Sequence, residues 1–201
     1  MNGWFWPSHS RVEVSRCVER FVNTSRVSSY YDWSTMGCST EVVVVAAGCC
    51  NEPRWIVLDV SDLTCLRSIE IGSDCFKNVE EVKWIGLNAL ESVVIGKNSF
   101  TRHKNSCGKD PNRHFQLKNC ERVRELKIGC GSFSGYSVCE IENVPSLEVI
   151  EMGELNRESL NYQGASLELK SDSQRIMVNK LASFEVTLVL LCYPLLSSCR
   201  I

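Results

Sequence analysis

An internal repeat in the middle of the chain limits the fold more than any other feature of the sequence. Four stretches align when they are superposed on the apolar residues Leu66, Leu90, Val123 and Leu147. Apolar residues recur three positions later, at Ile69, Val93, Leu126 and Ile150, and again at Ile71, Ile95, Ile128 and Met152. Glycine follows each time, at Gly72, Gly96, Gly129 and Gly153. Because so short a unit cannot bury its own apolar face, it is stable only when it stacks on its neighbours.

Each unit also has an earlier pair of apolar residues, two positions apart. The pairs are Leu58/Val60, Val82/Trp84, Phe115/Leu117 and Cys139/Ile141. Phenylalanine stands four positions after the glycine in three units, at Phe76, Phe100 and Phe133, whereas Arg157 takes this place in the last one. The alternation predicts two short strands per unit with a turn between them. We expect the glycine to supply a positive φ after the second strand, and the phenylalanine to fill the space between units.

The spacing of the units is regular except at one place. The aligned positions lie 24, 33 and 24 residues apart, so the middle step carries nine extra residues within 101–112. A weaker copy stands 24 residues before the first unit, with Val42, Val45, Ala47 and Gly48 in the matching places. The segment 166–178 fits the pattern poorly.

The segments LRSIEIGSDCF, LESVVIGKNSF and VRELKIGCGSF resemble leucine-rich repeats of the BspA-like class, which have an isoleucine-glycine pair and a following phenylalanine. The resemblance covers about residues 55–155, half of the chain. It implies a curved solenoid that binds other macromolecules, usually proteins, and many similar proteins are found on cell surfaces. We therefore expect a β-rich leucine-rich-repeat solenoid of about 24-residue units, with 4–5 coils and little helix.

The pattern divides the chain into three parts. Residues 1–53 are expected to form an N-terminal capping region with a weak first repeat, a short amphipathic helix at 11–22 and a buried strand at 41–50. Residues 54–170 form the solenoid, with the inserted loop at 101–112. Residues 171–201 form a degenerate repeat and an apolar tail. The apolar stretch 181–196 has 16 residues, fewer than the ~20 of a membrane span, which favours a buried strand or cap over a tail anchor.

Composition and motifs point away from catalysis. The chain has 201 residues, with 22 basic and 24 acidic side chains and a net charge of −2, so no basic footprint for nucleic acid is present. It has three histidines and none of the GxSxG, HExxH, GxxxxGK[ST] or GxGxxG motifs. We expect no enzymatic activity, no cofactor and no metal. The twelve cysteines include no CxxC pair and are expected to be reduced core thiols, with Cys120 and Cys139 in apolar positions.

Candidate partner-binding residues occupy outward positions that recur from unit to unit. The position after the aligned residue gives Arg67, Glu91, Arg124 and Glu148, and the outward position of the second strand gives Glu70, Val94, Lys127 and Glu151. The outward position of the first strand gives Asp59, Lys83, Gln116 and Glu140. These rows are either a mixed-charge binding face or a solvated face whose charges pair between neighbouring units.

The insertion gives a second candidate, a basic loop. It contains Arg102, His103, Lys104, Lys109, Arg113 and His114 against the single acid Asp110. Such a loop either binds an acidic partner or is a solvated excursion. A zinc site at His103, Cys107 and His114 has a spacing that matches no standard set, and RNA binding lacks interleaved aromatic residues.

The sequence therefore predicts a non-catalytic protein-binding module that recognises a protein partner through its exposed strand face. The alternatives are a truncated piece of a repeat array with no binding role of its own, motivated by the apolar stretch 181–196, and a surface adhesin-type protein. The start of the chain lacks the pattern of a secretory signal, which favours an intracellular location.

Overall fold

The computed structural model describes residues 22–102, 110–153, 161, 166–170, 177–179 and 187–190. These residues form two parallel β-sheets and one short helix, α1 (Tyr30–Ser34). The seven-stranded sheet consists, in order, of β1 (Thr24–Val27), β2 (Val42–Val45), β4 (Ser68–Ile71), β6 (Ser92–Ile95), β8 (Glu125–Ile128), β10 (Val149–Met152) and β12 (Met177–Asn179). The six-stranded sheet consists, in order, of β3 (Val57–Asp59), β5 (Glu81–Ile85), β7 (Asp110–Lys118), β9 (Tyr136–Glu142), β11 (Ser166–Lys170) and β13 (Thr187–Leu190).

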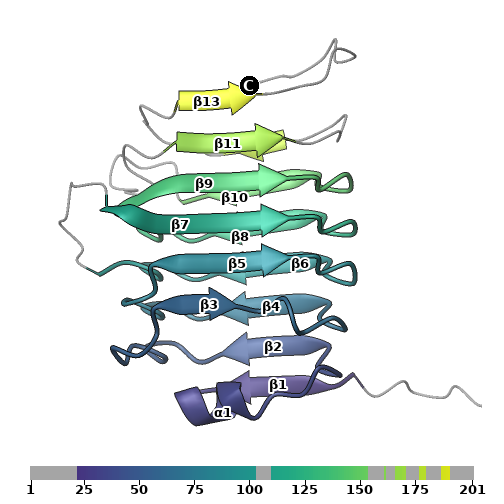
Figure 1. Ribbon diagram of the computed structural model, residues 1–201, viewed down its shortest axis with the longest axis vertical. Helices are drawn as coiled ribbons and strands as arrows, with labels where there is room; N and C mark the ends of the chain where they lie inside the picture. The colour runs from purple at the N-terminus through teal and green to yellow at the C-terminus, as the bar shows by residue number, and fades with distance from the viewer. Residues whose placement is uncertain are drawn as a thin grey trace, which may run out of the picture.

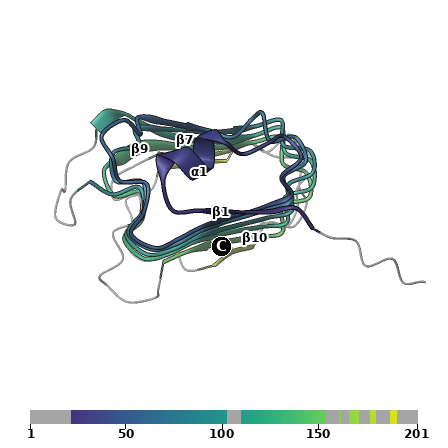
Figure 2. The same ribbon diagram turned by 90° about the horizontal axis from the view of Figure 1, so that it is seen from below.

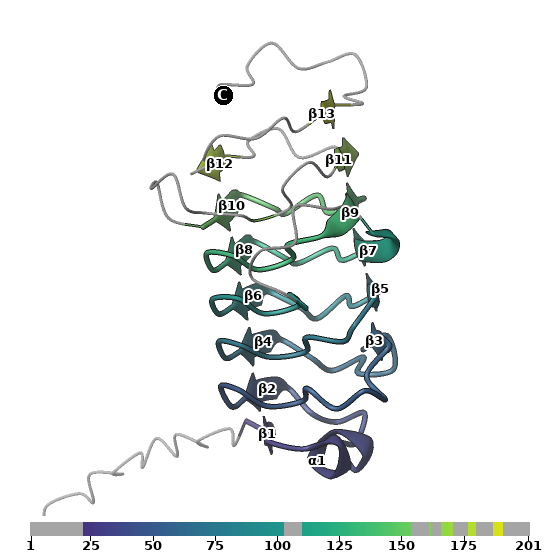
Figure 3. The same ribbon diagram turned by 90° about the vertical axis from the view of Figure 1, so that its left-hand side faces the viewer.

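From β2 to β11 the chain passes alternately through the two sheets, so that each sequence unit gives one strand to each (Figure 1). The sheets face one another across a common core, and α1 lies at the end of the stack beside the six-stranded sheet (Figures 2 and 3). Alternation of apolar and polar residues explains this arrangement, because successive side chains of a strand point to opposite faces. In β6, Val93 and Ile95 are buried, while Ser92 and Val94 are partly exposed.

Register confirms the alignment of the four sequence units. Ile69 pairs with Val93, Val93 with Leu126, and Leu126 with Ile150. In the other sheet, Leu58 pairs with Val82, Val82 with Phe115, and Phe115 with Cys139. All of these side chains are buried. The recurring apolar positions therefore form continuous rows inside the molecule.

The predicted fold class, a leucine-rich-repeat solenoid of 4–5 coils, is wrong. A leucine-rich repeat pairs one strand with a helical or 3₁₀ segment, which gives a single sheet lining a horseshoe. Here the first strands of the units hydrogen-bond to one another as well, and two facing sheets of seven and six strands result. The expectation of a β-rich chain with little helix is confirmed, since α1 with its five residues is the one helix in the described part.

The aligned glycines have a different role from the expected one. Gly153 has the expected positive φ of 70°, but Gly72, Gly96 and Gly129 do not. A Cβ at Gly96 would lie 2.5 Å from the backbone nitrogen of Ser73, and the other two would meet backbone at comparable distances. These three glycines are needed because the neighbouring strand ends approach too closely for any side chain.

The positive φ angles fall instead on the phenylalanines. Phe76, Phe100 and Phe133 have φ of 54°, 57° and 57°. Their rings are stacked, with centroids 5.3 Å apart between Phe76 and Phe100 and 4.6 Å apart between Phe100 and Phe133. The prediction that phenylalanine fills the space between units is confirmed. Aromatic burial offsets the cost of a left-handed backbone, which is about 1–2 kcal/mol per residue.

The weak first copy is present, but its predicted offset of 24 residues is wrong. Val43 pairs with Ile69 and Val45 with Ile71, an offset of 26 residues. The step from β2 to β4 is therefore two residues longer than a 24-residue unit. The expected strand at 41–50 is confirmed for β2, whereas the predicted helix lies, except for Val22, outside the described residues. Of the apolar stretch 181–196, the structure describes only the strand β13.

Short polar and aromatic contacts cover the N-terminal end of the core. Ser29 caps α1 together with Asp32, whose carboxylate accepts hydrogen bonds from the Ser28 and Ser29 backbone nitrogens at 2.8 and 3.0 Å. Trp33 packs edge-on against Trp55, with ring centroids 5.5 Å apart. The helix therefore closes the end of the core next to β3.

The expectation that the cysteines are core residues holds for only some of them: Cys38 and Cys65 are exposed, and Cys130 is partly exposed. Cys75, Cys120 and Cys139 are buried. Cys75 occupies the place of Ser99 in the next unit, and its backbone nitrogen donates to Ser99 Oγ at 3.2 Å. No helix in the described part of the chain is long and apolar enough to cross a membrane.

Candidate functional site

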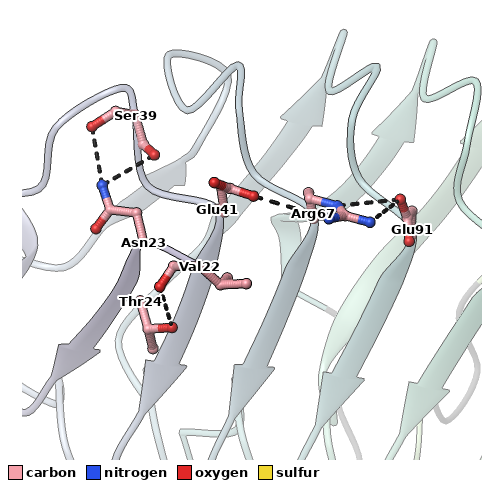
Figure 4. Close-up of polar contacts among 7 residues, drawn as sticks. All are labelled: Val22, Asn23, Thr24, Ser39, Glu41, Arg67 and Glu91. Atoms are coloured by element: carbon pink, nitrogen blue, oxygen red, sulfur yellow. Dashed lines mark hydrogen bonds and ion pairs between the residues drawn. The ribbon is translucent and has the colours of Figure 1, made fainter. Parts of the chain in front are cut away.

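A row of alternating charges runs along the edge where the chain enters the seven-stranded sheet. We define this rim row as Glu41, Arg67, Glu91, Arg124 and Glu148, each directly before a strand. The backbone nitrogen of Arg67 donates to the Glu41 carbonyl at 2.7 Å, and the same bond joins each later member to the one before it. The residues therefore stand side by side, as the aligned positions predict, and Figure 4 shows the first three.

Ion pairs occupy only the N-terminal half of the rim row. Arg67 contacts Glu91 at 3.0 Å and Glu41 at 4.0 Å. Arg124 and Glu148 are exposed, and neither forms an ion pair with any residue the structure describes. The C-terminal half of the rim row therefore presents unpaired charges to solvent.

A second row lies on the outward face of the same sheet. We define this face row as Glu70, Val94, Lys127 and Glu151, which pair in register on β4, β6, β8 and β10. Lys127 Nζ lies 2.6 Å from a carboxylate oxygen of Glu125, which raises the pKa of Lys127. Glu70 is exposed and has no ion-pair partner in the described part of the chain. The two rows together place Glu70, Arg124 and Glu148 on one surface as unpaired charges.

Glu41 is not among the predicted residues, because the first copy was aligned at an offset of 24 residues. At the observed offset of 26, Glu41 falls beside Arg67. Next to it, Asn23 Nδ2 donates to the carbonyl and the hydroxyl oxygen of Ser39, both at 3.1 Å (Figure 4).

The outward face of the six-stranded sheet differs in part: charges on β5, β7 and β9 pair with one another, whereas Asp59 of β3 is exposed and has no ion pair with any described residue. Lys83 contacts Glu81 at 2.9 Å, and Lys118 contacts Glu140 at 2.8 Å. Gln116 also donates to Glu140, at 2.7 Å. Burial opposes ionisation of Glu140, but its bonds to Lys118 and Gln116 outweigh burial and lower its pKa. The central part of this face is therefore self-paired.

The predicted basic loop is not a single surface. Arg102 is exposed and His114 is partly exposed on β7, while His103, Lys104 and Lys109 lie outside the described residues. Arg113 is buried, with 4% of its surface exposed, so its expected role in contacting a partner is wrong. Its charge alone suggested exposure, whereas packing against β9 determines its position.

Arg113 joins three backbone segments from inside the molecule. One guanidinium nitrogen donates to the carbonyls of Val79 and Phe100 at 2.7 and 3.0 Å, and lies 3.3 Å from that of Lys77. The guanidinium carbon stands 4.5 Å from the centre of the Tyr136 ring. Arg113 is therefore a structural residue at the base of the insertion.

A metal site finds no support among the described residues. His103 and Cys107 lie outside them, and His114 Nε2 is 2.6 Å from the carbonyl oxygen of Pro111. No group of three or more histidine, cysteine, aspartate or glutamate side chains in the described part could hold a metal ion.

A polar pocket of about 360 Å³ lies between β1 and α1. Its lining includes Arg26, Asp32 and Thr35. The carboxylate of Asp32 accepts hydrogen bonds from Ser28 and Ser29, which lower its pKa. This acid therefore serves the helix cap and is not poised for proton transfer.

Comparisons with protein-family models, with curated proteins and with solved structures each give no match. The resemblance to BspA-like leucine-rich repeats stays a prediction. Fold and surface define the chain as a β-rich protein with two parallel sheets, one of which presents unpaired charges on its outward side.

Proposed function

We propose that this protein is a non-catalytic binding module that recognises a protein partner through the outward side of its seven-stranded sheet. The observation that carries the proposal is the contrast between the two sheets. Glu70, Arg124 and Glu148 of the seven-stranded sheet are exposed and unpaired among the described residues, while on the other sheet Lys83 pairs with Glu81 and Lys118 pairs with Glu140 and Glu142.

A charge that already pairs with its neighbour must lose that pair before it can bind another molecule, whereas an unpaired charge at a sheet surface loses only water. Complementary charges across an interface give specificity and fast association. Parallel strands also hold these side chains at fixed spacing, because strands lie about 4.8 Å apart.

The test uses three full-length chains as bait in native lysate. The first is wild type, and the second carries Glu70→Lys, Arg124→Glu and Glu148→Lys. The third carries Asp62→Lys, Glu121→Lys and Arg122→Glu, which make the same charge changes at exposed positions in turns between the sheets. The proposal expects a protein that the wild type and the turn variant capture and the face variant loses.

The proposal is overturned if all three folded chains capture the same proteins in the same amounts. It is equally overturned if the turn variant loses the partner and the face variant keeps it. Circular dichroism of each bait establishes that it is folded before capture.

A further inference from the structure

The exposed large hydrophobic side chains of the described residues all lie at the N-terminal end of the molecule. They are Val22, Tyr30, Tyr31, Ile56 and Val57, with exposed fractions of 47, 39, 73, 44 and 44%. We define the N-terminal apolar patch as the four that belong to α1 and the start of β3, namely Tyr30, Tyr31, Ile56 and Val57. Clustered exposed apolar residues mark contact sites, whereas scattered ones need no explanation.

The patch forms where α1 packs against the segment that leads into β3. The Tyr30 ring packs edge-on against Trp55, with centroids 5.2 Å apart, and Trp55 directly precedes Ile56. The guanidinium of Arg54 lies 4.8 Å from the centre of the Tyr30 ring. The outer face of the patch therefore offers aromatic rings, branched aliphatic groups and a cation.

The patch also lies at the end of a sheet. Val57 pairs with Glu81, and β3 is the last strand of the six-stranded sheet at this end, next to α1 (Figure 3). Nothing among the described residues covers the outward side of Val57, which is 44% exposed. A segment that packs here would bury apolar surface and shield the end of the sheet.

The chain itself supplies a segment of matching chemistry. Trp4, Phe5 and Trp6 form the only run of three aromatic residues in the sequence. Fifteen residues separate Trp6 from Val22, where the described structure begins. Such a stretch can span up to about 50 Å, more than enough to pass from β1 to the neighbouring α1.

We propose that the N-terminal apolar patch is the docking site of the aromatic triplet Trp4-Phe5-Trp6 of the same chain. Each aromatic side chain can bury about 150–250 Å², and aromatic rings favour edge-to-face contacts such as those that Tyr30 already makes. Arg54 adds a cation to which an indole face is attracted. The covalent connection raises the local concentration of the triplet to the millimolar range, so that modest affinity suffices.

Hydrogen exchange of the full-length chain tests this docking. The variant W4S/F5S/W6S removes the triplet, and the matched control V12S/V14S removes two apolar side chains of the same N-terminal segment. Docking predicts that amides of 29–35 and 54–60 exchange about tenfold faster in the triplet variant than in wild type and in the control. Amides of 125–128 and 149–152 should exchange alike in all three and so report an intact fold.

A reciprocal experiment alters the patch and reads the triplet. Chymotrypsin cleaves after tryptophan and phenylalanine, so docking should slow removal of residues 1–6. In the variant Y31S/I56S, which changes two exposed side chains, cleavage there should become about tenfold faster. The proposal is overturned if exchange and cleavage are the same in wild type and variants. It is also overturned if protection disappears on hundredfold dilution, because the patch would then be covered by a second copy of the chain.

Discussion

Gly96 shows at the scale of one residue how closely successive units approach. An added Cβ would lie 2.5 Å from Ser73 nitrogen and 2.6 Å from the carbonyl carbon of Gly72. Because both contacts are with backbone, no side-chain rotation can relieve them. Gly86 has the opposite situation, with a φ of 73° and no atom within 4 Å of an added Cβ.

These two glycines give a matched pair of substitutions. Gly96→Ala should lower the free energy of unfolding by about 2–3 kcal/mol, because the strands must separate. Gly86→Ala should lower it by about 1 kcal/mol, the cost of a left-handed alanine. Urea denaturation measures both, and a loss at Gly86 equal to or larger than that at Gly96 would contradict the close approach.

Arg113 is a second residue whose environment gives a clear prediction. Arg113→Met leaves the buried carbonyls of Val79 and Phe100 without this donor, so stability should fall by about 2–4 kcal/mol. The control Arg102→Met changes an exposed side chain and should stay within about 0.5 kcal/mol of wild type. Thermal unfolding of both variants checks this, and equal melting temperatures would show that Arg113 is not buried.

Ionisation of the Cys50 thiol should make the free energy of unfolding depend on pH. Burial raises its pKa from 9.0 to about 12. Its folded pKa lies above its unfolded pKa, so its contribution is complete below about pH 9 and is lost as pH rises towards 12. Under reducing conditions, the free energy of unfolding should fall between pH 8 and 10.5, and less steeply in Cys50→Ala. Identical slopes for the two chains would refute this contribution.

At the scale of one structural element, the rim row combines a paired half and an unpaired half. Arg67 and Glu91 approach to 3.0 Å, but the side chains of both are 41% exposed. Solvent screening limits such pairs, so a double-mutant cycle with alanine should give a coupling of about 0.2–1 kcal/mol. The same cycle for Arg124 and Glu148 should give no measurable coupling. A larger value there would mean that these two residues pair in solution.

At the scale of the whole molecule, sequence patterns predict the strands better than the sheets they form. The apolar positions of both strands, their register across four units and the stacked phenylalanines follow from periodicity, because each buried position must be apolar in every unit. Periodicity does not determine whether the first strands also join a sheet of their own. The second sheet depends on backbone hydrogen bonds between units, such as the one from the Glu81 nitrogen to the Ile56 carbonyl. Every residue type except proline can donate such a bond, so the sequence does not reveal it.

The candidate binding surface was predictable to a similar extent. Its rows follow from the aligned units, but which charges pair depends on local geometry. Glu41 lies beside Arg67 because the step from β2 to β4 is 26 residues, which the 24-residue spacing of the sequence alignment did not show. The N-terminal apolar patch was not predicted, because Tyr30 and Ile56 are far apart in sequence and come together only when α1 packs on Trp55.

The most direct test of the proposed function is the affinity of the captured partner, once purified, for the three chains used as bait. We expect Glu70→Lys, Arg124→Glu and Glu148→Lys together to weaken binding at least about tenfold, with an unchanged melting temperature. The matched variant at Asp62, Glu121 and Arg122 should bind as wild type does. Equal affinity of all three folded chains would contradict recognition by the seven-stranded sheet.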